Sequence, residues 1–201
     1  TFMSASLGWV LSEEKFFEKL KKTVNFLKIR ASYGTLGNDN TGGVAFPYYS
    51  RFELYSGATA SNYLPNNLGD YVFGSLLTKG LVPGAVANAM ATWEKSTKTN
   101  IAMDATLFNR LNLTVDFFME RRTDILVQRY DEVPSSFGGT LPLENLGEVK
   151  NKGVDFSLSY HQKVREVDFT LGGNFTFARN KIVEMAEAVG TSEYMRKTGR
   201  P

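Results

Sequence analysis

The sequence predicts an all-β fold in which long antiparallel strands form an arc of a larger transmembrane β-barrel. Apolar and polar residues alternate with a period of two over several segments, which is typical of strands with one apolar face. The clearest segments run for about 10 residues, close to the roughly 9–11 of a tilted membrane-spanning strand. The breaks between them are alternately short and long, as in outer-membrane barrels with short periplasmic turns and long extracellular loops.

Composition agrees with such a barrel and excludes several other classes. The chain has 201 residues, a formal net charge of +2 and 42% hydrophobic residues. No apolar run reaches the roughly 18 residues of a transmembrane helix, whereas a barrel's alternating strands average to ordinary hydropathy. Cysteine is absent and His161 is the single histidine, which argues against thiolate chemistry, a histidine metal cluster and a Ser-His-Asp triad. The low net charge gives no indication of a nucleic-acid-binding surface.

The first predicted elements are a strand over residues 2–10 and a short amphipathic helix over residues 12–24. Ser12 is placed as the helix N-cap, with Glu13 and Glu14 in the first turn, where acids suit the helix dipole. Three lysines follow near the end of this segment. They form either a solvated helix face, which we favour, or a surface for an anionic partner.

A second strand is predicted from Asn25, with Lys28 and Arg30 on its polar side. In a bilayer, a register slip of one residue would place both cations in lipid at about 2–4 kcal/mol each near the midplane. We therefore expect Lys28 and Arg30 to face the water-filled lumen or whatever fills it.

Residues 35–92 are predicted to form a long extracellular loop region, rich in turn residues and aromatic rings. Rings stack on the apolar faces of ligands, while the interspersed Asn and Asp side chains bind hydroxyl groups, so this segment suits sugar or peptide ligands. The alternative for any single ring is that it packs the loop's own small core. The candidate contact residues are Tyr48, Tyr49, Phe52, Tyr55, Tyr63 and Tyr71.

The clearest hairpin is predicted over Thr97–Glu120, with its turn at Asn109-Arg110. An irregular stretch is expected over residues 121–146. Two further strands follow over residues 150–161 and 167–177, separated by a break at 162–166. The tail after Arg179 has no assigned structure.

Paired acids on these strands could suggest glycoside hydrolysis, because Asp104, Asp116, Asp155 and Asp168 recur on successive strands. That recurrence is also what a water-filled lumen produces. We interpret Asp104 and Asp155 as lumen-facing, and we expect no catalytic residue, no metal site and no cofactor.

Several blocks of the sequence resemble the SusC/RagA family of TonB-dependent outer-membrane transporters, in the order expected for that family. These blocks are Trp9–Glu14, Leu27–Gly34, Gly37–Asp39, Trp93–Asn100, Val115–Phe118, Arg122–Leu126, Asn145–Gly153 and Ala178–Ile182. The resemblance implies that residues 1–201 come from the later part of a plugged barrel of about 22 strands. The abrupt start at Thr1 and the equally abrupt end fit a fragment of a longer chain. The blocks lie where strands meet loops, so we interpret them as architectural, with Trp93 at the headgroup interface.

The resemblance also implies a cellular setting and partners. Members import glycans or peptides across the Gram-negative outer membrane, with a SusD-like surface lipoprotein as lid and TonB acting through a plug domain that these residues do not include. The loop aromatics would then contact substrate or the lid. The other interpretation of the alternation is a soluble β-sandwich that binds carbohydrate, although a sandwich predicts shorter strands of roughly 6 residues.

Overall fold

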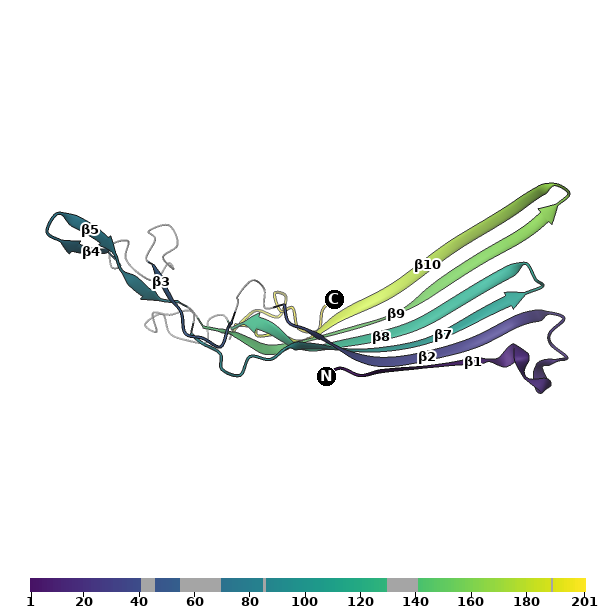
Figure 1. Cartoon of the computed structure of the whole chain (residues 1–201), viewed down its shortest axis with the longest axis horizontal. Helices are drawn as coiled ribbons and strands as arrows, with labels where there is room; N and C mark the ends of the chain where they lie inside the picture. The colour runs from purple at the N-terminus through teal and green to yellow at the C-terminus, as the bar shows by residue number, and fades with distance from the viewer. Residues whose placement is uncertain (41–45, 55–69, 85, 130–140, 189) are drawn as a thin grey trace.

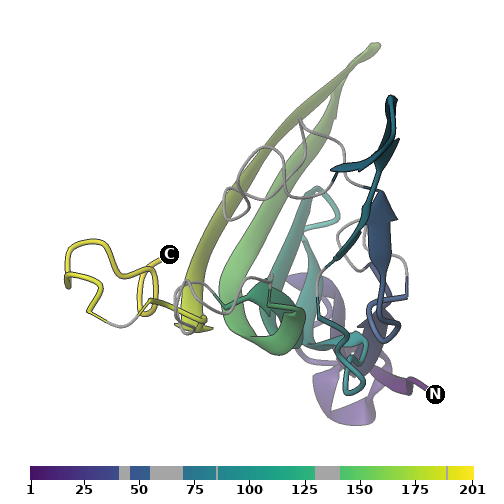
Figure 2. The ribbon, with the colours of Figure 1, turned by 90° about the vertical axis from the view of Figure 1, so that its left-hand side faces the viewer.

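The computed structural model describes residues 1–40, 46–54, 70–84, 86–129, 141–188 and 190–201. Six long strands form one antiparallel sheet in the order β1-β2-β7-β8-β9-β10. Their bounds are β1 Ser4–Val10, β2 Val24–Asn38, β7 Glu94–Leu107, β8 Leu111–Gln128, β9 Leu143–Val164 and β10 Val167–Glu184. Figure 1 shows these strands side by side in a single layer that bends along its length, and Figure 2 shows the same layer from one end. The all-β antiparallel class is confirmed.

Two small sheets lie between β2 and β7 in the chain. Strand β3 (Phe52–Leu54) pairs with β6 (Leu81–Pro83), and β4 (Asp70–Phe73) pairs with β5 (Leu76–Lys79). Both project beyond one end of the six-stranded sheet (Figure 1). The segment predicted as a long loop therefore contains two short antiparallel strand pairs of its own, of which β4–β5 is a hairpin.

The amphipathic helix predicted over residues 12–24 is wrong. The chain there forms two short 3-10 turns, Leu11–Glu13 and Lys15–Phe17, and Ser12 lies inside the first turn instead of capping a helix. The reason is geometric, because this segment must reverse the chain between paired strands, in which Val10 lies opposite Lys28. Ser12 and Phe17 are buried, so the segment packs as a compact turn. No helix in the described ranges is long and apolar enough to cross a membrane.

The connections alternate in length and define two ends of the sheet. At the short-turn end, residues 108–110 join β7 to β8, and Arg165-Glu166 join β9 to β10. At the long-loop end, residues 39–93 join β2 to β7, and residues 129–142 join β8 to β9. Backbone hydrogen bonds also tie neighbouring turns together, because the Phe108 N–H donates to the Thr23 carbonyl at 2.9 Å.

The strands are longer than the alternation predicts. The stretch of residues 121–146 is not irregular throughout, because β8 continues to Gln128 and β9 already begins at Leu143. Register shifts at Ile125 interrupt the alternation, and Asp124 has a positive φ of 59°. Such bulges hide a strand from a period-two pattern without ending its pairing. The break predicted at residues 162–166 likewise shrinks to two residues.

The register sorts side chains into two faces. The apolar face includes continuous cross-strand rows, such as Trp9-Ile29-Met103-Val115-Phe156-Phe175 and Leu7-Ala31-Ile101-Phe117-Val154-Phe177. The polar face carries Lys28, Arg30, Asp104, Asp116 and Asp155 on the intervening positions. Every strand of the main sheet thus contributes one residue in two to an apolar surface.

Few side chains are buried in the described part of the chain, and the buried apolar ones are Phe17, Ala102 and Ala105. Large residues of the apolar face are exposed instead, including Leu171 at 76% and Phe175 at 61%. A β-sandwich would cover this face with a second sheet, and the described residues place none there. The sheet is therefore a wall whose apolar side meets something outside these residues.

Candidate functional site: the polar face and the long-loop end

A cluster of one arginine and three aspartates occupies the polar face. Arg30 binds Asp104 in a bidentate manner, with Nε 2.7 Å from Oδ2 and Nη2 3.1 Å from Oδ1. The same Nη2 lies 3.6 Å from Asp116 Oδ1, and Thr114 Oγ1 donates to Asp104 Oδ1 at 3.3 Å. Paired, charge-assisted hydrogen bonds of this kind fix side-chain orientation as well as charge, so strands β2, β7 and β8 are cross-linked here.

Asp155 extends this cluster onto β9, where it lies directly opposite Asp116. Its Oδ1 atom is buried and accepts no hydrogen bond from the described residues. Arg30 contacts the carboxylates of Asp104 and Asp116, and Lys28 lies directly opposite Asp104. The register therefore brings Lys28, Arg30, Asp104 and Asp155, the four predicted polar residues, onto one face.

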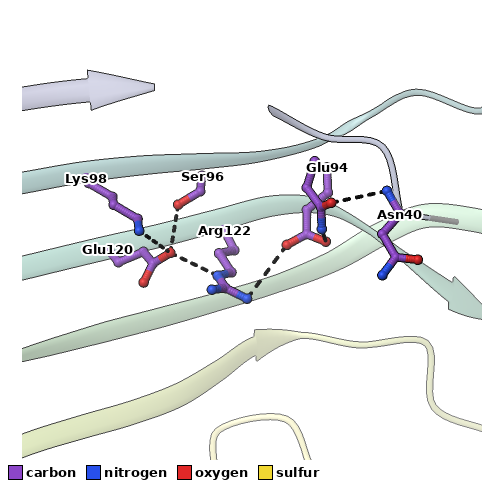
Figure 3. Close-up of polar contacts among 7 residues, drawn as sticks. Asn40, Glu94, Ser96, Lys98, Glu120 and Arg122 are labelled. Carbon is purple, nitrogen blue, oxygen red and sulfur yellow. Dashed lines mark hydrogen bonds and ion pairs between the residues drawn. The ribbon is translucent and has the colours of Figure 1, made fainter. Parts of the chain in front are cut away.

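A second network lies on the same face nearer the long-loop end. Figure 3 shows side chains of β7 and β8 converging on Glu120. Ser96 Oγ donates to Glu120 Oε1 at 2.7 Å, Arg122 Nε donates to the same oxygen at 2.9 Å, and Lys98 Nζ lies 3.8 Å away. Arg122 also reaches Glu94, with Nη1 3.9 Å from Oε1. Each acid in this network is paired with a basic side chain. Such pairing is typical of a structural network and not of a catalytic site.

This network leads to a small pocket at the long-loop end. Asn38 Nδ2 donates to Glu94 Oε2 at 3.4 Å, and the Asn40 N–H donates to Asn38 Oδ1 at 3.1 Å. These asparagines, together with Tyr48 and Trp93, line a pocket of about 100 Å³. Amide groups and two aromatic rings thus meet in this pocket, and ligand binding by the loop stays a prediction.

The other predicted loop aromatics are placed unevenly. Tyr48 and Tyr49 contact one another with ring centroids 4.7 Å apart, yet 48% and 64% of their surfaces are exposed. Phe52, in β3, is 70% exposed, and Tyr71 belongs to β4. Tyr55 and Tyr63 lie outside the described residues. Only Tyr48 and Tyr49 are thus seen together, and they both pack on a neighbour and present ring surface outward.

Small residues line the part of the polar face of β1 and β2 that lies beyond Lys28 and Arg30. Ser4 lies opposite Gly34, Ser6 opposite Ser32, and Gly8 opposite Arg30. A Cβ added at Gly34 would lie 2.9 Å from the Ser4 Cβ atom, so the two strands pack closely at this point.

One further residue, Asn145, organises the long-loop end; the sequence places it in an architectural block but does not show its contacts. Asn145 accepts a hydrogen bond from the Thr92 N–H at 2.9 Å and donates to the carbonyls of Thr92 and Asp124 at 2.8 and 2.6 Å. One amide thereby joins the approach to β7, the bulge of β8 and the start of β9. Its partners are 53 and 21 residues away in the chain, which explains why local pattern could not identify it.

Comparison with known proteins gives a consistent result. A family model described as "TonB dependent receptor-like, beta-barrel" matches residues 4–199. TonB-dependent receptor P3 of Formosa agariphila is 32% identical over 181 residues, which cover 90% of this chain and 16% of that protein. TonB-dependent receptor SusC of Bacteroides thetaiotaomicron is 28% identical over 198 residues, which cover 97% of this chain and 18% of that protein. The chain therefore spans less than a fifth of these relatives.

Solved structures show the same fold. The RagAB peptide importer in its closed-closed state superposes with a TM-score of 0.74 at 23% identity, covering 100% of this chain and 20% of that one. The open-open state of the same importer gives a TM-score of 0.73. The six-stranded sheet therefore has the shape of part of a known barrel wall.

Proposed function

We propose, from the premise that this chain belongs to the TonB-dependent receptor-like β-barrel family, that it forms part of the wall and the substrate-facing loops of an outer-membrane active transporter. One observation carries the proposal. The sheet has an uncovered apolar face that continues across all six strands and an opposite face of matched charges. In a barrel wall, the first face meets lipid and the second faces the lumen, because lipid-facing and lumen-facing residues alternate.

The transported substrate is proposed to be a glycan, with a peptide as the second candidate. The rings beside Asn38 and Asn40 favour a glycan, because aromatic rings stack on sugar faces while amides bind hydroxyl groups. The RagAB structure, described as a peptide importer, is the observation that keeps peptides under consideration. A SusD-like lipoprotein is the proposed partner at the long-loop end, and TonB would act through a plug domain elsewhere in the full protein.

Thiol labelling tests which face meets lipid. Single cysteines replace Lys28, Asp104 and Asp155 on the polar face, and Ile101 and Leu113 on the apolar face, in the full-length protein. In intact outer membranes, a membrane-impermeant polar maleimide should label the first set, because it reaches water-exposed thiols. The second set should react only after detergent extraction. Equal labelling of both sets would contradict the assigned faces.

Alanine substitution tests the loop. Tyr48→Ala with Tyr49→Ala should lower uptake of fluorescent oligosaccharides or weaken co-purification of the lipoprotein severalfold, because exposed rings supply contact surface. Tyr194→Ala is the matched control, since Tyr194 is 73% exposed in the C-terminal segment. Unchanged uptake and unchanged co-purification in the double variant would remove these tyrosines from the substrate and lid surface. Parallel uptake of labelled peptides distinguishes the two substrate classes.

A further inference from the structure

A cluster of five cations lies on the apolar face where that face approaches the long-loop end. The register places Met119, Lys152 and Arg179 in one cross-strand row, and Arg121, Lys150 and Lys181 in the next row towards the long loops. The five basic residues, all exposed, are Arg121, Lys150, Lys152, Arg179 and Lys181. We call them the cationic cluster. They lie on three adjacent strands, β8, β9 and β10.

Internal ion pairs account for only part of this charge. Glu148 binds Arg121, with Oε2 2.8 Å from Nη2, and its Oε1 lies 3.3 Å from Lys150 Nζ. No acid of the described residues forms an ion pair with Lys152, Arg179 or Lys181. Three positive charges therefore remain available to an outside partner on a face that is otherwise apolar.

An apolar groove adjoins these free cations. It has a volume of about 440 Å³ and is lined by Ile101, Phe117, Met119, Val154 and Phe177 among others, with Lys152 and Arg179 at its polar margin. Phe117 and Phe177 are 59% and 48% exposed. The Arg179 guanidinium lies 5.5 Å from the centre of the Phe177 ring. The groove and the cations therefore form one continuous surface.

The position of the cluster matches the edge of a membrane. On β7 the apolar face runs over the nine residues from Thr99 to Leu107, at the lower end of the roughly 9–11 residues with which a tilted strand crosses a bilayer. Outer-membrane barrels carry an apolar band about 25 Å tall, bounded by the two interfaces. Lys152 and Arg179, which share the row of Thr99, thus lie where an acyl chain ends and a headgroup begins.

We propose that this surface binds a phosphorylated lipid of the outer leaflet. An acyl chain lies in the groove along Phe117, Val154 and Phe177, and a headgroup phosphate binds Lys152 and Arg179, with Lys181 contributing further positive charge. Charge complementarity identifies the occupant, because phosphate oxygens accept charge-assisted hydrogen bonds from Arg and Lys, whereas a neutral lipid would leave three cations unmatched. The assignment rests on the proposed function only for which face meets lipid.

The test measures lipid retention by the folded full-length barrel. Protein purified in dodecyl maltoside is incubated with bisphosphorylated lipid A or with the same lipid after removal of its phosphates, and bound lipid is quantified by native mass spectrometry. Wild type should prefer the phosphorylated lipid. Lys152→Gln with Arg179→Gln should lower its retention about tenfold, because two charge-assisted contacts are lost. Lys152→Arg with Arg179→Lys should preserve it.

The matched control changes the same charge on the same hairpin at the opposite end. Lys163→Gln with Arg165→Gln should retain lipid like wild type, since both residues lie at the β9–β10 turn. Equal retention in the Lys152/Arg179 variant and this control would overturn the proposal, as would equal binding of dephosphorylated lipid or displacement of the lipid by millimolar inorganic phosphate.

Folding and transport are scored separately. Heat-modifiable electrophoretic mobility reports whether each variant is a folded barrel. If the Lys152/Arg179 variant does not fold, the wild-type preference between the two lipids decides the matter. A wild-type protein that prefers the phosphorylated lipid but shows no uptake would count against the transporter proposal and not against this lipid site.

Discussion

At the scale of single residues, Gly153 shows how a missing side chain shapes the wall. It lies on β9 directly opposite Phe118 of β8. A Cβ at this position would lie 2.5 Å from Phe118 Cζ and 3.0 Å from the Ala178 Cα atom. The ring therefore lies across the glycine and covers backbone that would otherwise be bare, an arrangement that stabilises glycine within strands.

This geometry predicts that Gly153→Ala destabilises the barrel by about 1–3 kcal/mol, because the added methyl group forces the ring or the backbone to shift. Gly173→Ala is the control, since a Cβ there meets nothing within 4 Å. The control should be neutral or slightly stabilising through reduced unfolded-state entropy. Urea unfolding of the full-length protein in lipid vesicles measures both. Equal free energies of unfolding for the two variants would show that position 153 has room for a methyl group.

At the scale of elements, the segment after β10 folds back along that strand. The Gly199 N–H donates to the Ile182 carbonyl at 2.7 Å, and the Ile182 N–H donates to the Arg200 carbonyl at 2.8 Å. Gly199 has a φ of +90°, which resembles a bulge with glycine at its first position. Glu187 fastens this return, because it accepts hydrogen bonds from the Lys197 and Thr198 N–H groups at 2.6 and 2.8 Å.

The backbone hydrogen bond from Thr198, with that from Lys197, holds the pKa of Glu187 below its ordinary 4.5. A carboxyl with a lowered pKa stabilises the fold above its ordinary value, and the stabilisation is lost as the pH falls below 4.5 through the lowered pKa. Amides 197 and 198 should therefore be protected at neutral pH and lose protection in acid.

Glu187→Gln tests this at pH 7 without acid, because a neutral amide is a weaker acceptor than a carboxylate. Hydrogen–deuterium exchange of amides 197 and 198 should become severalfold faster. Glu193→Gln is the control, since no hydrogen bond or ion pair to its carboxylate is seen in the described residues. Identical protection in both variants would show that Glu187 does not hold the segment.

The elements also show what sequence could and could not predict. The alternation of apolar and polar residues identified all six strands of the main sheet, because a sheet with one apolar face needs a period of two. It missed the ends of β8 and β9, where a bulge at Ile125 breaks the period while pairing continues. It mistook residues 12–24 for a helix, because Phe16, Phe17 and Leu20 repeat at helical spacing in what is a compact turn.

The site was predicted in the same uneven way. The alternation along each strand was enough to assign four residues to the polar face, because successive side chains point to opposite faces. These residues are Lys28, Arg30, Asp104 and Asp155. Their pairing could not be assigned in this way, because the Arg30–Asp104 contact spans 74 residues of chain and depends on which strands are neighbours. The Glu120 network was missed for the same reason.

At the scale of the whole molecule, the described residues form a sheet with little buried core, made of Phe17, Ala102 and Ala105. Leu7, Leu171 and Phe175 are more than 60% exposed, and such a continuous apolar face marks an interaction surface when it is uncovered. The described residues must therefore be stabilised by groups outside them, as when neighbouring strands close a barrel and remove its unpaired edges.

Residues 1–201 expressed alone should consequently aggregate in buffer and need detergent for recovery. Circular dichroism and sedimentation velocity with and without dodecyl maltoside measure this. The apolar face is too large to remain in water, so the expected result in buffer is high-mass species without a cooperative melt. A detergent-free monomer with a cooperative melt would contradict the barrel wall and return the β-sandwich to consideration.

The small residues of β1 and β2 have a consequence for whatever fills the barrel. Beyond Lys28 and Arg30, the small residues Ser4, Ser6, Ser32 and Gly34 present little side chain on the polar face, whereas Phe118, Glu120 and Arg122 lie on that face of β8, two strands from β2. The polar face is thus uneven, recessed beside β1 and β2 and raised along β8. A domain that packed on this face would bring its main chain close to the main chain of β1 and β2. Along β8, the larger side chains would hold it further away and leave room for water.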